Sequence, residues 1–193
     1  GAIQPIPGAA LRVLLAHHPT VGLIPLALGR DRMRAVMAHF GSQIYLCGHA
    51  HMDNFAWDGT TLLVQAAEFG EDVTFMLVAT DEGGLSARSF PITGPWVMIT
   101  SPVDPDLGGD NPQARPFSPG STIPVRAVGT GLREELALQV RVENGAWVDM
   151  TKTRTGVWEA DVTLPAAAGS CSLTVRGSSS EGSSEHQIQV SVQ

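Results

Sequence analysis

The chain has 193 residues, 43% of them apolar, which is enough for one large or two small domains with real cores. Its formal net charge of -7 and its lack of a basic run exclude nucleic acid as an expected partner, because nothing would neutralise the phosphates. No apolar run reaches the about 18 residues of a membrane-spanning helix, and the frequent Gly (21) and Pro (13) favour strands and turns over long surface helices.

The first half of the chain predicts a strand–helix–strand unit followed by two hairpins. Apolar runs predict buried strands at 11–16 and 44–46, separated by a Pro- and Gly-rich loop at 19–29 and a helix at 31–40 that Gly41 ends. Asp58-Gly59 is a turn signal between predicted strands, and so is the sequence Asp-Glu-Gly-Gly at 81–84. The hairpins therefore form a meander after the second buried strand.

The composition changes at 91–95, and from Trp96 onward the sequence predicts strands and no helix. Short β-rich runs that alternate with turn residues are typical of a β-sandwich, in which Trp147 and Trp158 are expected as core or inter-sheet aromatic residues. Cys47 and Cys171 are far apart in the chain and are expected to be two buried thiols rather than a disulfide. The predicted strands of this half are residues 97–100, 122–127, 136–142, 156–164, 172–176 and 187–192.

Histidines follow both buried strands of the first half. His17 and His18 come after the first strand, and the sequence Gly48-His49-Ala50-His51 comes after the second. Imidazole is a ligand suited to Zn, Fe, Mn and similar ions. Two histidines separated by one residue, in extended backbone at a strand end, are expected to face one cavity, with Gly48 permitting the tight backbone there. These residues predict a transition-metal site. In it, His18 is expected either to support a metal ligand without binding the ion itself or to face the substrate.

The remaining candidates have simpler explanations. His39 is expected to stabilise the C-terminus of the predicted helix, and His186 is expected to have only a structural role at the start of a strand. Asp31 and Asp53 are acids in the right region, but each is expected to be a solvated loop or helix-cap residue.

The motifs His17-His18-Pro19 and Gly48-His49-Ala50-His51 resemble those of the C-terminal half of the calcineurin-like metallophosphoesterases. The resemblance covers roughly residues 9–92. Residues 68–99 resemble a subgroup in which the catalytic domain is followed by an Ig-like domain. Together these resemblances imply an α+β chain. Residues 1–94 would be the C-terminal part of an α/β/β/α sandwich, and residues 95–193 would be an all-β Ig-like sandwich.

The same resemblance implies site roles and a substrate class. His17 and His49 resemble ligands of one metal ion, His51 resembles a ligand of a second, and His18 is the candidate catalytic residue. The implied reaction is hydrolysis of phosphate mono- or diesters with Mn, Fe or Zn. The family's earlier acidic motifs do not occur in this chain, and residues 1–16 contain no Asp, Glu or His.

Two functions follow as expectations. In the first, the chain is the C-terminal fragment of a metal-dependent phosphoesterase and is inactive alone, because two-ion hydrolysis needs carboxylates that it lacks. Its expected partner is then the missing N-terminal half, or a second copy of the chain through exposed strand faces. In the second, the chain is a non-enzymatic Ig-like interaction module with a remnant or mononuclear histidine site.

Overall fold

In a computed structural model, which describes residues 8–21, 29–67, 73–131 and 133–193, the chain divides into two compact units. The first comprises residues 1–74 with 108–110, and the second comprises residues 75–107 with 111–193. The domain boundary predicted from the sequence lies between residues 94 and 95, and it stays a prediction. Most of the predicted loop at 19–29, and residues 68–72 of the resemblance, lie outside the described residues.

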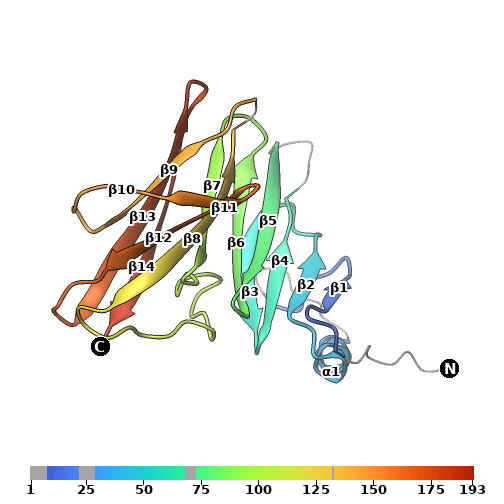
Figure 1. The fold of residues 1–193 in the computed structure, drawn as a ribbon. Helices are drawn as coiled ribbons and strands as arrows, with labels where there is room; N and C mark the ends of the chain where they lie inside the picture. The colour runs from blue at the N-terminus through green and yellow to red at the C-terminus, as the bar shows by residue number, and fades with distance from the viewer. Residues whose placement is uncertain (1–7, 22–28, 68–72, 132) are drawn as a thin grey trace. The chain divides into compact units, whose positions relative to one another are not determined.

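The first unit is built on a four-stranded sheet of order β1-β2-β4-β3, seen at the blue end of the ribbon in Figure 1. Strands β1, β2 and β4 are parallel, and β3 pairs with β4 in antiparallel orientation. A parallel pair needs a crossover connection, which helix α1 provides between β1 and β2. The elements are β1 (Val13–Leu15), α1 (Arg30–Phe40), β2 (Ile44–Cys47), β3 (Asn54–Asp58) and β4 (Thr61–Gln65).

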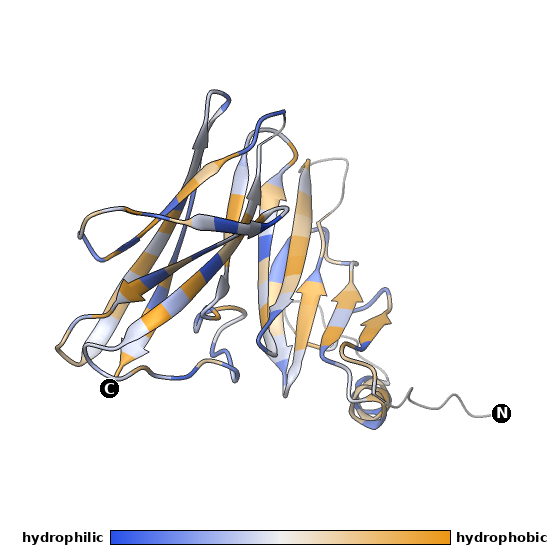
Figure 2. Cartoon of the chain, in the orientation of Figure 1, coloured by the Kyte–Doolittle hydropathy of each residue, from blue (hydrophilic) through white to orange (hydrophobic). Residues whose placement is uncertain are grey.

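One helix face and one sheet face form the core of the first unit. Met37 of α1 is buried with Tyr45, Cys47 and Leu63 of the sheet, because apolar residues recur at helical spacing in α1. Figure 2 shows hydrophobic positions along the strands of this sheet. Gly41 ends the helix in a left-handed conformation with φ 56°, as the sequence predicted. The predicted helix and both predicted strand positions around it are therefore confirmed.

The second unit is a β-sandwich of two four-stranded sheets with a two-stranded hairpin. One sheet has the order β10-β9-β13-β14, the other has the order β11-β12-β8-β7, and β5 pairs with β6. The hairpin turn has positive φ at Glu82 and Gly83, the type of turn that the Asp-Glu-Gly-Gly sequence predicts. The strands are β5 (Thr74–Asp81), β6 (Gly84–Pro91), β7 (Trp96–Ser101), β8 (Thr122–Thr130), β9 (Ala137–Val142), β10 (Val148–Asp149), β11 (Thr151–Arg154), β12 (Val157–Thr163), β13 (Gly169–Ser179) and β14 (Gly182–Val192).

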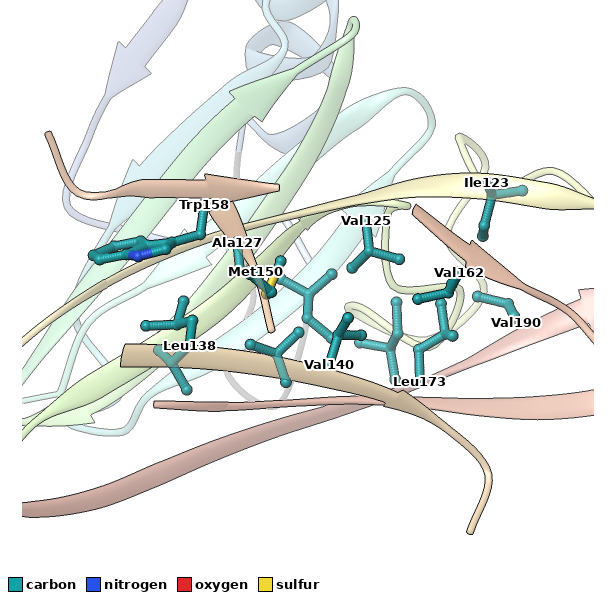
Figure 3. Packing of buried hydrophobic residues seen from close by; sticks show 14 of the residues in the cluster. Ile123, Val125, Ala127, Leu138, Val140, Met150, Trp158, Val162, Leu173 and Val190 are labelled. Atoms are coloured by element: carbon teal, nitrogen blue, oxygen red, sulfur yellow. The ribbon is translucent and has the colours of Figure 1, made fainter. Parts of the chain in front are cut away.

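The sandwich core lies between the two sheets. Strand positions alternate between buried and exposed, so every second residue points inward, as β8 shows from Ile123 to Gly129. In Figure 3, Val125 and Ala127 of one sheet point toward Val140 and Leu173 of the other. Cys171 lies in this core and Cys47 in that of the first unit, both as buried free thiols, which confirms the prediction for the cysteines.

The predicted α+β class is wrong. Across the described residues, one helix of 11 residues stands against fourteen strands, so the chain is almost entirely β. The class followed from the helices that flank the sheets in the α/β/β/α family. The composition, low in charge and rich in Gly and Pro, favoured strands and turns instead.

Candidate metal centre

The parallel pairing of β1 and β2 brings the histidine segments together. Leu15 of β1 lies opposite Leu46 of β2, so the residues that follow these strands leave the sheet at the same edge. The pairing continues past the strands, since Ala16 N–H donates to the Leu46 carbonyl at 3.0 Å and Gly48 N–H donates to the His17 carbonyl at 3.1 Å. His17 and His49 therefore meet because of where their strands end.

Three imidazole rings converge at this edge. Ligand nitrogens of His17, His18 and His49 all lie within 4.8 Å of one another, and they form the one such group of metal-binding side chains among the described residues. His49 Nδ1 and His17 Nε2 are 3.2 Å apart, and the rings of His18 and His49 have centroids 4.0 Å apart. Nitrogens bound tetrahedrally to one zinc ion lie about 3.3 Å from each other, so the spacing of His17 and His49 suits a shared ion.

His51 lies outside this group of nitrogens. The sequence prediction assumed extended backbone through His49 and His51, and that assumption is wrong, because both residues adopt left-handed conformations with φ 80° and 54°. Non-glycine residues in this conformation are uncommon and are strained, and they concentrate at functional sites. The role of His51 as the ligand of a second ion stays a prediction.

The surroundings of His49 and Cys47 shift the pKa values of both side chains. Partial burial, followed by electrostatic interaction with His18, His17 and His51, lowers the pKa of His49 below its ordinary value, which favours the neutral ring that a metal requires. Burial raises the pKa of the Cys47 thiol to about 11, so this sulfur stays protonated near neutral pH. The candidate donors are therefore the imidazole nitrogens, which suit borderline transition-metal ions.

The other sequence candidates have structural roles. Asp53 accepts hydrogen bonds from Ala67 N–H at 2.8 Å and from Thr74 Oγ at 3.1 Å, and Asp31 lies in the first turn of α1. His39 lies in the last turn of α1, near the negative end of the helix dipole. His186 belongs to β14 in the second unit.

Sequence reasoning missed four residues that hold the histidine segment. The Tyr45 hydroxyl donates to the His18 carbonyl at 2.8 Å. Thr20 Oγ and Arg34 Nε both donate to the carboxylate of Asp58, at 2.7 and 2.9 Å. The available signals are a tyrosine within an apolar strand and an aspartate in a sequence that predicts a turn.

No protein-family model and no curated protein matches the sequence. Among solved structures, the chain is similar to an endo-beta-1,4-mannanase from Thermotoga petrophila, with 11% identity and a TM-score of 0.41, over 94% of this chain and 47% of that chain. It is also similar to the titin Ig tandem domains A164-A165, with 16% identity and a TM-score of 0.32, over 75% of each chain. The chain spans about half the length of the mannanase, and at these TM-scores neither likeness supports a conclusion about fold or function. The phosphoesterase resemblance stays a prediction.

Proposed function

We propose that this chain carries the histidine part of a metal-dependent phosphoesterase centre and binds one divalent transition-metal ion through His17, His18 and His49. The observation that supports the metal site is the convergence of three imidazole nitrogens within 4.8 Å. Phosphate esters are proposed as the substrate class because of the His-His-Pro and Gly-His-x-His motifs. Mn, Fe and Zn are the candidate ions, because imidazole binds all three.

His18 is assigned to the ligand set rather than to proton transfer, because its ring nitrogen belongs to the group. A bound ion would polarise a phosphoryl oxygen and lower the pKa of a bound water. The chain's own contribution is to hold three imidazoles at one sheet edge. Two-ion hydrolysis also needs carboxylates, and the group contains only histidines among the residues described. We therefore propose that a second polypeptide segment completes the phosphoesterase centre.

The open edge of the first sheet offers a place for such a segment. Strand β1 forms one edge of the sheet in the described part of the chain. Val13 and Leu15 are exposed on it, Leu15 to 76%, and Leu11 just before the strand is exposed too. An apolar edge strand pairs readily with another strand.

We expect self-association when no partner is present. Light scattering of Leu15→Lys should show less association than the native chain. Ile92→Lys, at an exposed site in the second unit, is the matched control and should leave association unchanged.

Metal titration tests the binding part of the proposal. Isothermal titration of the native chain with Zn²⁺ should give one ion per chain, and His49→Ala should weaken binding by more than the roughly 10- to 100-fold typical of residues that only support a ligand. His39→Ala, which removes an imidazole at the end of α1, should leave the affinity unchanged. Native protein that binds no Zn²⁺ would contradict the proposal.

Phosphate binding and hydrolysis test the reaction class. The Zn²⁺-loaded chain should bind inorganic phosphate, and His49→Ala should not. The chain alone should turn over p-nitrophenyl phosphate slowly or not at all with Mn²⁺ or Zn²⁺. Fast turnover that His49→Ala abolishes would support phosphate-ester hydrolysis as the reaction. It would also show that no second segment is needed.

A non-enzymatic metal-binding module is the second candidate function. The observation that favours it is the all-histidine composition of the group, because three histidines hold a single ion without carboxylates. One bound ion without phosphate binding would favour this candidate. One bound ion together with phosphate binding would favour the phosphoesterase centre.

A further inference from the structure

A buried hydroxyl contacts the backbone of the histidine segment. Tyr45 in the middle of β2 is 1% exposed, and its hydroxyl donates to the His18 carbonyl at 2.8 Å. A phenylalanine would fill the same space in the core beside Met37 and Leu63 without a polar group to satisfy. The tyrosine therefore fixes the position of His18 in addition to packing the core.

A second buried contact holds the same segment two residues further on. Thr20 is fully buried, and its hydroxyl donates to Asp58 at the end of β3. Arg34 of α1 donates to the same carboxylate at 2.9 Å. Burial by itself would raise the pKa of Asp58, but the hydrogen bonds from Arg34 and Thr20 lower it, so the carboxylate stays charged and keeps both partners.

Three hydrogen bonds hold the segment that carries His17 and His18. The His17 carbonyl accepts from Gly48 N–H, the His18 carbonyl accepts from Tyr45, and Thr20 is tied to Asp58. Each residue is thus held to a different element: the loop after β2, β2 itself and the end of β3. A ligand loop fixed at three points loses little conformational freedom on binding an ion.

We infer that Tyr45 and Asp58 are positioning residues, which set the geometry of the His17–His18 pair around a metal ion through the His18 carbonyl and Thr20. This inference deepens the proposed function, because it rests on metal binding by the histidine group. It predicts that removing either contact weakens metal binding although no ligand is lost.

The test compares two variants with controls of matching chemistry. Tyr45→Phe removes one hydroxyl that donates to a backbone carbonyl, and Ser86→Ala removes another, because Ser86 Oγ donates to the Thr100 carbonyl in the second unit. Asp58→Asn alters a carboxylate that accepts from a threonine hydroxyl and an arginine Nε. Asp81→Asn alters one with the same two kinds of partner, Thr100 and Arg126.

Three quantities are measured on each full-length variant: Zn²⁺ affinity by titration, the visible absorption spectrum of bound Co²⁺, and thermal unfolding without metal. Tyr45→Phe and Asp58→Asn should each weaken Zn²⁺ binding about tenfold and change the Co²⁺ spectrum. Ser86→Ala and Asp81→Asn should leave both unchanged. The metal-free unfolding temperature should fall no further in the test variants than in their controls.

The outcomes separate this inference from the proposed function. If the native chain binds no Zn²⁺, the proposed function fails and this inference fails with it. If the native chain binds and both test variants bind equally well with unchanged Co²⁺ spectra, only the inference fails. If both test variants unfold without metal, their contacts maintain the fold rather than the ligand geometry, and the inference is refuted.

Discussion

The ring of His186 acts as a hydrogen-bond acceptor within the second unit. Ile99 N–H donates to His186 Nδ1 at 2.9 Å, which requires that nitrogen to be unprotonated. Burial of the ring, and to a smaller extent the charge of Arg88, lower its pKa to about 3. His186 is therefore neutral in the folded protein at every pH near neutrality.

This low pKa predicts a pH dependence of stability. Between pH 6.5 and about 3, the unfolded chain protonates His186 and the folded chain does not, so the free energy of unfolding falls as pH decreases through that range. The stabilising contribution is complete above pH 6.5. His186→Gln retains an acceptor for Ile99 and does not titrate. Denaturant unfolding from pH 7 to 4 should give a shallower decline in this variant, and equal slopes in the two proteins would contradict the assignment.

Single residues show where the sequence predicted the site and where it could not. The meeting of His17 and His49 followed from apolar strands that end at histidines. His18 joins the group because the backbone bends directly after β1, so that successive side chains do not alternate as in a strand. The left-handed conformations of His49 and His51 are likewise conformational facts that residue types do not encode.

At the scale of elements, the end of α1 depends on one glycine. Gly41 N–H donates to the Ala38 carbonyl while the residue sits at φ 56° and ψ 46°. Gly41→Ala should lower the stability of the first unit by about 1 kcal/mol, because a β-carbon is unfavourable in this conformation. An added β-carbon would meet Arg12 Nη1 at 3.4 Å, an ordinary contact, so crowding is not the cause. Gly41→Asn should cost less in denaturant unfolding, and equal losses would argue for a different cause.

Strand prediction worked where apolar residues alternate and failed where they do not. Strands β10 and β11 were missed, because all their residues are exposed and carry no buried pattern. Trp147, expected in the core or between the sheets, instead contacts the guanidinium groups of Arg141 and Arg176, which lie 4.5 and 4.3 Å from its ring centroid. Trp158 is buried in the sandwich core as expected. Aromatic character alone does not distinguish core packing from cation–π contacts near the surface.

At the scale of the whole molecule, the residue pattern predicted elements better than it predicted class. The helix predicted at 31–40 follows from helical spacing and the two strands beside it from short apolar runs, and the structure has the helix at Arg30–Phe40. The α+β class follows instead from the resemblance to a family with flanking helices. The described part of the chain has no helix with the length and apolar character needed to cross a bilayer. Strands can be predicted from the local sequence. Which helices or sheets pack on the faces of a sheet cannot, because that packing depends on residues far apart in the sequence.

The division into two units makes metal binding a local perturbation. His17, His18 and His49 all belong to the first unit, so an ion that binds only the folded form stabilises that unit by mass action. At a Zn²⁺ concentration about 100 times the Kd, the gain is about 2.7 kcal/mol. Hydrogen exchange followed by mass spectrometry should therefore show slower exchange in β2 and β4 and unchanged exchange in β13 and β14. His49→Ala should remove the difference. Equal protection of both units would mean that they unfold as one cooperative body, and no protection in either would mean that the histidines do not hold an ion.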